Sequence, residues 1–413
     1  MIAAKVEYTK NAWLVDYPSH WEVLRIKNLF QEMDSRSETG SEELLSVSNY
    51  TGVTLKRESL ENEDDHLSNA ESLVGYKLVS KNDLVINIML AWNGSLGISQ
   101  HNGMTSPAYC VYRIKGDNNP EYFGYLFTTN LFKAEFRRHS TGIIDSRLRL
   151  YSDKFFGIFT VVPPKDEQDE IVKYIKAQEE KINLFIQKKK RFIELLKEQR
   201  LSVVNIAVTN EGKNWAWLRL KDIVTINDEA LTEKTEDDYF IKYIDIGCVN
   251  SYGDIAEIQE YTFKEAPSRA RRIVKKGDVI ISTVRTYLKA ITLIESEEDN
   301  LIASTGFAIL RPKNDVLSEY LNFALRAEYF IASVIKNSYG VSYPAINSTT
   351  LSGLKIVIPK SIKEQEEIIN TIKAETTTID KAIAKTEREI ELIREYKEAM
   401  ISEVIMGKRN INE

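Results

Sequence analysis

Cysteine and histidine are scarce in this chain, and neither is spaced for a disulfide or a metal site. The two cysteines, Cys110 and Cys248, lie far apart with no candidate metal ligands beside them. We expect both to be small buried apolar residues in a reducing compartment. The four histidines share no ligand spacing; they are His20, His66, His101 and His139. A disulfide framework and a zinc site are therefore not expected.

Long apolar runs and an excess of positive charge are also lacking. Residues 1–13 have no apolar core of the kind found in a signal peptide, and no apolar run approaches about 18 residues. The sequence thus predicts a cytoplasmic protein without a membrane span. The formal net charge is −6, from 55 Lys and Arg against 61 Asp and Glu. This balance weighs only weakly against a DNA partner, because a basic face can coexist with acidic helices.

Recognisable catalytic motifs are the third absence. The sequence has no Gly-Lys-Ser/Thr phosphate loop, no nucleophile–histidine constellation and no carboxylate pair whose spacing suits acid–base chemistry. Residues 119–122 (NPEY) are superficially similar to the Asn-Pro-Pro-Tyr motif of adenine methyltransferases, but the second proline and a preceding Gly-rich loop are missing. We expect a turn that opens a helix there. The chain is predicted to be non-catalytic and to bind no cofactor of its own.

What the sequence does contain is an internal duplication. Residues 21–30 (WEVLRIKNLF) are echoed by 215–224 (WAWLRLKDIV), 194 positions later, and 157–163 (GIFTVVP) by 353–359 (GLKIVIP). Glu167-Gln168 is matched by Glu364-Gln365. Because the matches keep one order and nearly one offset, chance is a poor explanation. The length and the repeat together predict two domains of one fold, residues 1–164 and 211–360.

Another matched pair of segments predicts a strand hairpin in each half. Residues 77–86 (KLVSKNDLVI) correspond to 272–281 (RIVKKGDVII). In each, an apolar run is followed by a two-residue turn, Asn82-Asp83 or Gly277-Asp278, and by a second apolar run. We expect the two runs of each segment to pair with each other.

Each half ends in a long segment without glycine or proline, which predicts a central helix within 165–210 and a C-terminal helix within 361–413. Both segments begin with helix-start signals, namely the charges of Asp166, Glu167 and Asp169 in the first and a capping box of Ser361 and Glu364 in the second. Gly212 and Gly407 stand where the helices would stop.

An apolar stripe with steps of three, four and seven residues runs along both helices, as is typical of a coiled coil. The stripe of the first helix consists of Ile171, Ile175, Ile182, Ile186, Ile193 and Leu196. In the second helix it consists of Ile368, Ile372, Ile379, Ile383, Ile390 and Ile393, each 197 positions later. A helix of about 40 residues extends roughly 60 Å, which is longer than a domain of this size is wide. We therefore expect the two helices to pair; the alternative is that each packs only on its own domain.

The predicted fold class is α+β, with two similar mixed α/β domains separated by two long helices that form an antiparallel coiled coil of pseudo-twofold symmetry. Two similar domains held about one helix length apart suit a ligand with repeating sites at a fixed spacing. DNA is the obvious ligand of this kind, because a rigid spacer corresponds to a fixed number of base pairs.

The domain edges resemble those of specificity subunits from type I restriction-modification systems. The similar segments are the domain openings 21–27 (WEVLRIK) and 217–223 (WLRLKDI), and the strand-to-helix junctions 161–168 (VVPPKDEQ) and 358–365 (IPKSIKEQ). Inside the domains, residues 48–54, 91–97, 106–109, 136–142 and 147–150 are similar to one recurring type of target-recognition domain, and 282–288 to another. The resemblance covers essentially the whole chain.

This resemblance implies a subunit that binds a bipartite, asymmetric DNA sequence. It also implies that two methyltransferase subunits are recruited through the long helices, and that restriction subunits join for cleavage. S-adenosylmethionine would be bound by the partner methyltransferase, and ATP and Mg²⁺ by the partner restriction subunit. Two alternatives stay open: a coiled-coil protein-interaction scaffold that does not read DNA, and an enzyme with an unrecognised site.

Candidate DNA contacts in the first domain form two groups. Arg137 and Arg138 end a helix-like stretch just before Thr141, and Arg147 and Arg149 follow on alternate positions that would share one face of a strand. Clustered arginines beside a glycine turn can clamp phosphates and reach guanine edges, but they can equally form ion pairs on a solvated surface. The second group, Trp92, Asn93 and Ser95, lies after the strand expected at 84–89. Asparagine suits adenine recognition, although Asn-Gly is also common in turns.

The second domain offers three groups of candidates. Arg269 and Arg271 lie in a short basic span, and Arg285, Tyr287 and Lys289 occupy alternate positions past a strand. The last group flanks Gly340, which aligns with Gly142 of the first domain, and consists of Tyr339, Ser342 and Tyr343. Plain surface charge and aromatic packing are the alternatives to DNA contact for these residues.

Overall fold

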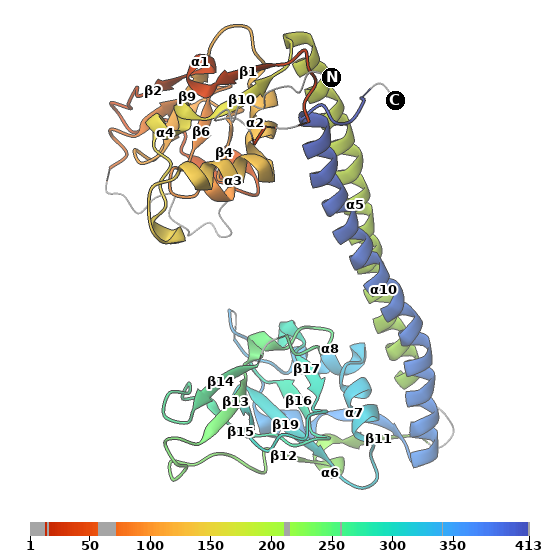
Figure 1. Ribbon diagram of the computed structural model, residues 1–413. Helices are drawn as coiled ribbons and strands as arrows, with labels where there is room; N and C mark the ends of the chain where they lie inside the picture. Colours follow the sequence, from red (N-terminus) through yellow and green to blue (C-terminus); the bar gives the residue numbers. More distant parts are fainter. Residues whose placement is uncertain are drawn as a thin grey trace, which may run out of the picture. The chain divides into compact units, whose positions relative to one another are not determined.

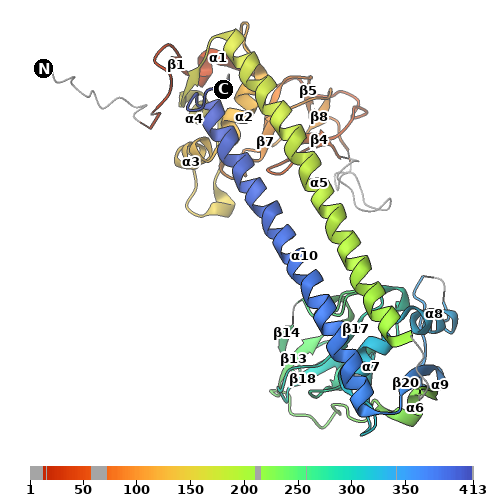
Figure 2. The same ribbon diagram turned by 90° about the vertical axis from the view of Figure 1, so that its right-hand side faces the viewer.

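The computed structural model describes residues 13–411 except for 15, 57–71, 210–214, 257 and 341. His66 and Gly212 therefore lie outside the described residues. The chain divides into two compact units, Met1–Lys188 with Glu389–Glu413, and Lys189–Arg388. Each unit contains one mixed α/β domain together with a part of both long helices (Figures 1 and 2).

The first domain is built on an antiparallel four-stranded sheet in the order β2-β9-β6-β7. These strands are Phe30–Met33, Cys110–Ile114, Leu84–Ile86 and Leu96–Ile98. Two short pairs accompany the sheet, β3 (Leu45–Ser48) with β4 (Gly52–Leu55) and β5 (Lys77–Val79) with β8 (Gly103–Thr105). The first strand, β1 (Glu22–Arg25), pairs with the last, β10 (Phe159–Val162), so the two ends of the domain meet just before the long helix.

The described helices of this domain include α1 (Ile26–Leu29), α2 (Pro120–Thr128), α3 (Asn130–His139) and α4 (Ser152–Gly157). The 3₁₀ turns η2 (Ala91–Asn93) and η3 (Asp145–Arg147) lie in the loops. Asn119 caps α2, since its side chain accepts a hydrogen bond from the backbone N–H of Glu121 at 2.9 Å. The expected helix-opening turn at 119–122 is thus confirmed.

The second domain repeats this element order. Its first sheet, β12-β19-β16-β17, is antiparallel and consists of Val224–Ile226, Phe307–Pro312, Val279–Ser282 and Ile291–Leu293. A second sheet, β14-β13-β18-β15, consists of Gln259–Thr262, Phe240–Ile244, Leu301–Ser304 and Ala270–Ile273. The closing strand pair is β11 (Trp215–Arg219) with β20 (Lys355–Pro359). The helices are α6 (Leu220–Ile223), α7 (Ser318–Leu325), α8 (Glu328–Lys336) and α9 (Ser348–Gly353), with the 3₁₀ turns η4 (Ile246–Cys248) and η5 (Thr286–Leu288).

The predicted hairpins are wrong, although their strands and turns exist. β5 pairs with β8 while β6 pairs with β7 and β9, and in the second domain β15 pairs with β18 while β16 pairs with β17 and β19. The turn itself sends the chain from one sheet into another. Its aspartate, Asp83 or Asp278, is almost fully buried and accepts hydrogen bonds from an arginine of the neighbouring strand, Arg113 or Arg311. The side chain thereby ties the turn to the central sheet.

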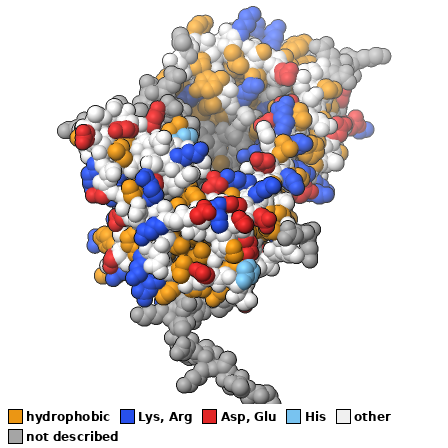
Figure 3. All heavy atoms as spheres, turned by 90° about the horizontal axis from the view of Figure 1, so that it is seen from above, with side chains coloured by type: hydrophobic (Ala, Val, Ile, Leu, Met, Phe, Trp, Pro, Cys, Tyr) orange, Lys and Arg blue, Asp and Glu red, His pale blue; other side chains and the backbone are white. Residues whose placement is uncertain are grey.

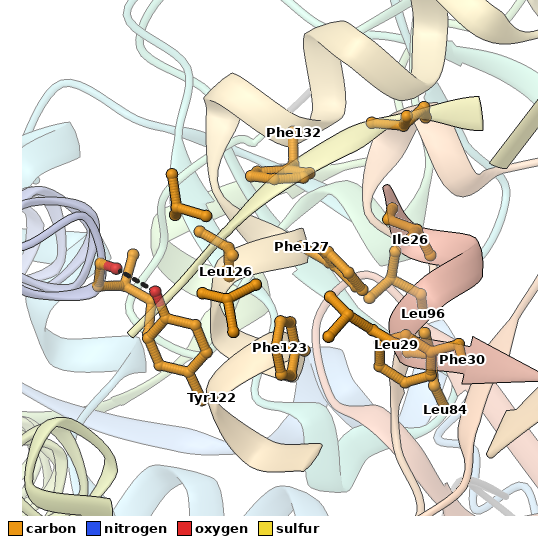
Figure 4. Packing of buried hydrophobic residues seen from close by; sticks show 14 of the residues in the cluster. Ile26, Leu29, Phe30, Leu84, Leu96, Tyr122, Phe123, Leu126, Phe127 and Phe132 are labelled. Atoms are coloured by element: carbon orange, nitrogen blue, oxygen red, sulfur yellow. Dashed lines mark hydrogen bonds between the residues drawn. The ribbon is translucent and has the colours of Figure 1, made fainter. Parts of the chain in front are cut away.

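Aromatic side chains fill the core of the first domain (Figure 4). Phe123 and Phe127 of α2 pack against Phe30, with ring centroids 5.6 and 6.0 Å apart, and all three rings are fully buried. Burial of each such ring contributes roughly 1.5–3 kcal/mol. Tyr122, on the same helix, donates from its hydroxyl to the backbone carbonyl of Ile405 at 2.9 Å. The end of the C-terminal helix is therefore part of this core.

The long helices are α5 (Lys165–Thr209) and α10 (Ile362–Ile405). In the first unit the start of α5 and the end of α10 share the domain core, and Lys397 pairs with Glu179 at 2.9 Å. In the second unit the end of α5 and the start of α10 do the same, and Arg200 pairs with Asp380 at 2.9 Å. The helices thus run antiparallel within each unit and also pack on the domain. Gly407, with φ of 67°, ends α10 as expected.

The apolar stripe faces inward along both helices. The buried members are Ile171, Ile175, Ile182, Leu196, Ile372, Ile379 and Ile390. The half-buried members are Ile186, Ile193, Ile368, Ile383 and Ile393. Among the residues described, no helix is long and apolar enough to cross a membrane.

The repeated Glu-Gln pair joins each domain to its helix. Trp21 donates from its indole N–H to Glu167 at 3.0 Å, and Trp215 donates to Glu364 at 2.7 Å. The next residue, Gln168 or Gln365, is completely buried.

Each buried glutamine makes an equivalent set of bonds to the backbone. Gln365 accepts from the N–H of Leu317, which precedes α7, and donates to the carbonyl of Pro359, at the end of β20, at 2.9 and 3.1 Å. Gln168 bonds to Asn119 N and Pro163 O in the same way, at 2.8 Å each. One side chain thus joins the last strand, a domain helix and the long helix.

We expect Gln365→Leu to lower the free energy of unfolding by about 2–4 kcal/mol, because it leaves the N–H of Leu317 and the carbonyls of Asp315 and Pro359 without their bond to a buried side chain. Urea denaturation monitored by tryptophan fluorescence measures the change. The neighbouring Glu366→Gln, at an exposed position, is the matched control and should change stability by less than about 0.5 kcal/mol. Equal effects of the two substitutions would contradict the assigned role.

Asp278→Asn should cost about 3–5 kcal/mol, because it breaks an ion pair whose carboxylate is buried. The same carboxylate also accepts from the backbone N–H of Lys275 at 2.8 Å. Thermal unfolding of the variant is compared with that of Asp299→Asn, where the aspartate is exposed. A melting temperature of Asp278→Asn equal to that of the control would show that the pair is dispensable.

Candidate nucleic-acid interface

In each domain, two loops that carry candidate residues are brought together. In the first domain these are residues 87–95, which follow β6, and residues 140–150, which follow α3. The backbone N–H of Leu150 donates to the carbonyl of Ile88 at 2.9 Å, and the guanidinium carbon of Arg137 lies 5.2 Å from the centre of the Trp92 ring. The two groups of candidates identified in the first domain are therefore neighbours.

The 140–150 loop is held at both ends. Thr141 and Arg149 exchange two backbone hydrogen bonds of 2.8 and 2.9 Å, and Arg137 pairs with Asp145 through contacts of 2.6 and 3.2 Å. Arg147 ends a 3₁₀ turn, so the expectation that Arg147 and Arg149 share one face of a strand is wrong. The side chain of Arg149 bonds instead to carbonyls of its own loop, at Ser146 and Leu148.

These contacts, together with burial, determine which first-domain candidates are available to a ligand. Asn93, Thr141 and Arg147 are exposed, whereas Ser95 is buried inside its loop with 3 % of its surface exposed. Arg138, although next to Arg137, pairs with Glu135 and lines a separate cavity of about 440 Å³ beside Arg25. The structure thus separates Arg138 from the group around Trp92.

The second domain brings together the equivalent loops, residues 283–289 and the described part of 338–346, which leaves out 341. Ile346 N donates to Thr283 O at 2.8 Å, and the hydroxyl oxygens of Thr286 and Ser338 lie 3.0 Å apart. Arg285 stacks over the ring of Tyr343 at 5.0 Å. Exposed side chains on these loops are those of Arg285, Tyr287, Lys289, Tyr339, Ser342 and Tyr343.

The backbone of the first of these loops is strained. Arg285 and Lys289 have φ angles of 50° and 53° and ψ angles of 49° and 33°, in the left-handed region that residues other than glycine rarely adopt. Such a conformation costs of order 1–3 kcal/mol, and it persists only where the surrounding structure enforces it, often at a binding site. Here the bonds to the 338–346 loop hold the conformation and present Arg285 on its outer side.

Beneath Arg285 lies a cavity of about 690 Å³ whose lining is apolar at Ile246, Val284 and Leu288 and basic at Arg269 and Arg285. Arg269 is exposed, while Arg271 is half-buried and stacks over Phe263 at 4.6 Å. Asp245, also in the lining, accepts a hydrogen bond from Tyr243 at 3.0 Å. Burial, together with this bond, raises the pKa of Tyr243 to about 12, so its hydroxyl keeps its proton at neutral pH.

Two further features were not identified from the sequence. Ile143, in the 140–150 loop, has 99 % of its surface exposed beside the candidate arginines, and nothing in an Ile-Ile pair signals this. Lys289 lines a second cavity, of about 460 Å³, together with Arg326. Arg326 is a single basic residue between two helices, with no pattern around it that could have marked it.

On the face drawn in Figure 3, Lys and Arg side chains are interspersed with Asp and Glu, so the charge there is mixed. Within the described part of the chain, no group of three or more His, Cys, Asp or Glu side chains is placed to hold a metal ion. The loops of the two domains carry arginine, aromatic and amide side chains. Side chains of these types commonly contact bases and phosphates in protein–DNA complexes.

Comparison with known proteins finds specificity subunits of type I restriction enzymes. Residues 212–392 match the model of the type I restriction modification DNA specificity domain. The specificity subunit of the type I restriction enzyme MjaVIII, from Methanocaldococcus jannaschii, is 22% identical over 96% of this chain and 95% of that protein. The HindI specificity subunit of Haemophilus influenzae is 31% identical, but the match covers 26% of this chain and 24% of the relative.

Solved structures show the same fold. A chain from a structure that concerns complex assembly and conformational transition of the type I R-M system matches with a TM-score of 0.66 and 13% identity, over 95% of this chain and 99% of that one. The HsdS subunit from Thermoanaerobacter tengcongensis matches with a TM-score of 0.50 and 15% identity, over 96% and 99% of the two chains. The family model and the relatives support a type I restriction-modification specificity subunit, and the solved structures share its fold.

Proposed function

We propose that this chain reads a bipartite, asymmetric DNA sequence, with one half-site for each domain, and directs partner methyltransferase and restriction subunits to it. The observation that carries the proposal is that the same two loops meet in both domains with different side chains. Trp92, Asn93 and Arg147 occupy them in the first domain, and Arg285 and Tyr343 in the second. A repeated frame with different contact residues suits two half-sites of different sequence.

The residue types on these loops match the chemistry of base recognition. An arginine can donate two parallel hydrogen bonds to guanine, and an asparagine can bond to adenine in the same bidentate manner. Stacking on Tyr343 limits the directions in which Arg285 can point, which reduces the entropy lost when it binds a base. We assign base contact to Asn93, Arg147, Arg285 and Tyr287, which are exposed, rather than to Ser95 or Arg271.

In this proposal the chemistry belongs to the partners. Methylation would use S-adenosylmethionine bound by two methyltransferase subunits, and cleavage would use ATP and Mg²⁺ on the restriction subunits. Exposed apolar side chains on the long helices support partner docking there. In the first unit these are Leu184, Leu392 and Tyr396, and in the second unit Phe192, Leu195 and Ile206. Such side chains on otherwise polar helices are typical of protein-binding surfaces.

Replacement of residues 215–359 by the equivalent domain of a relative should change one half of the methylated sequence and leave the other half unchanged. The reason is that each domain is closed by its own strand pair, β11 with β20 in the second. Methylome sequencing of cells that express the hybrid with its methyltransferase measures the result. A change in both half-sites, or in neither, would contradict the assignment of one half-site to each domain. If cells that express the unaltered chain with its methyltransferase showed no methylated sequence, the scaffold alternative would be favoured.

Arg285→Ala should weaken binding of the methyltransferase complex to its target about 10- to 100-fold, as expected when a bidentate hydrogen-bond pair to a base is removed. The weakening should depend on a base pair in the half-site of the second domain. Competition binding with targets mutated one base pair at a time measures this. Arg271→Ala is the control, because Arg271 stacks on Phe263 and bonds to the carbonyl of Ala270; the reverse ranking of the two variants would refute the assignment.

A further inference from the structure

Arg326, between α7 and α8, is a largely buried arginine whose charge is not balanced by an ion pair. Among the described residues, no carboxylate lies within 4.0 Å of its guanidinium, and its buried Nη2 has no hydrogen-bond partner. Burial lowers the pKa of the side chain to about 10. A buried guanidinium is costly unless acceptors bind its five N–H groups. An anionic group would remove this cost.

The surrounding chain leaves space for the guanidinium. Gly253 has a φ of 85°, and a Cβ atom at this position would lie 2.9 Å from Nη1 of Arg326 and 2.7 Å from the carbonyl oxygen of Ile291. Any larger residue at 253 would therefore displace the arginine. The glycine allows the 250–254 turn to close over Arg326 without a side chain between them.

A cavity of about 460 Å³ opens beside Arg326, and we call it the Arg326 pocket. It is lined by Asn205, Tyr252, Lys289, Arg326, Glu328 and Ile331, among others. Lys197 of α5 lies over the ring of Tyr252 at 4.9 Å. Among the described residues neither Lys197 nor Lys289 has a carboxylate within 4.0 Å, and Glu328 is the one carboxylate in the lining. The pocket therefore carries an excess of positive charge.

We propose that the Arg326 pocket binds a phosphate group of the DNA backbone. This inference rests on the proposed function. Its main support is that Lys289 ends the loop that begins at Arg285: Leu288 lines the cavity beneath Arg285, and Lys289 lines the Arg326 pocket. One short loop thus contributes to the lining of both cavities. A DNA strand whose bases contact Arg285 and Tyr287 would place an adjoining phosphate near Lys289 and Arg326. Such a contact fixes the position of the DNA without reading its sequence.

The equivalent cavity of the first domain differs in charge. Its volume is about 590 Å³, and it is lined by Tyr50 in a turn and by residues near the end of α10, as the Arg326 pocket is lined by Tyr252 in a turn and by residues near the end of α5. Its lining includes Glu179, Glu395 and Glu398 as well as Lys133 and Lys397, and Glu179 already pairs with Lys397. None of the described residues in this lining is an arginine. We therefore assign the phosphate-binding role to the second domain.

The test compares the salt dependence of DNA binding by complexes of the chain with its methyltransferase. Fluorescence anisotropy over a series of KCl concentrations gives the slope of log K against log salt, whose magnitude falls by about 0.9 for each DNA phosphate that the protein no longer neutralises. Arg326→Gln and Lys289→Gln should each lower this magnitude and weaken binding about 5- to 10-fold, equally for target and non-target DNA. Lys355→Gln, which removes an exposed lysine from the same unit, should change neither.

Arg326→Lys retains the charge and should restore most of the slope, which separates phosphate binding from a purely structural role. Thermal unfolding of each variant shows whether it is folded. Folded Arg326 variants with the parental slope would overturn the inference, as would a weakening confined to one base pair of the target. Weaker copurification of the methyltransferase with an unchanged slope would assign the pocket to a protein carboxylate instead. Failure of the parent complex to prefer its target would refute the proposed function itself.

Discussion

A buried glutamine at the junction of domain and helix, which occurs twice, determines how each domain is attached to its long helix. Gln168 and Gln365 each bond to the end of the last strand and to the residue before a domain helix, from the first turn of a long helix. A buried amide without water must find both donors and acceptors, which restricts the three elements to one arrangement. The neighbouring glutamates, bonded to Trp21 and Trp215, bring in the first strand as well. The candidate DNA-binding loops are thus carried by a domain whose connection to its helix is defined.

The residues that the internal duplication matches are the ones that hold this junction. The domain edges and the Glu-Gln pairs were found from the sequence, and they occupy equivalent places in both domains. The hairpins were mispredicted because a turn signal says where a strand ends but not which strand it pairs with. β5 and β15 find their partners far along the chain, and pairing of that kind is decided by tertiary packing rather than by local sequence.

The candidate site shows the same limit at the level of side chains. Arg137 and Arg138 are indistinguishable in the sequence, yet one stacks on Trp92 and the other lines a different cavity beside Arg25. Adjacent residues on a helix point about 100° apart, so the two arginines face different parts of the domain. The sequence alone does not show what lies on either side. The role of Arg326 could not be predicted from the sequence for a related reason. Its significance comes from the absence of a carboxylate around it among the described residues, and only the folded chain shows what surrounds a residue.

The participation of α10 in the first domain has a consequence for synthesis. Met400, Val404, Ile405 and Met406 are buried in the core that Phe30, Phe123 and Phe127 begin, and Tyr122 bonds to the carbonyl of Ile405. The first domain therefore lacks part of its core until residues 400–406 have been synthesised and have left the ribosome. The second unit, residues 189–388, can complete its packing earlier. A chain interrupted before residue 400 would expose an open hydrophobic core in its first domain and would be subject to aggregation or proteolysis.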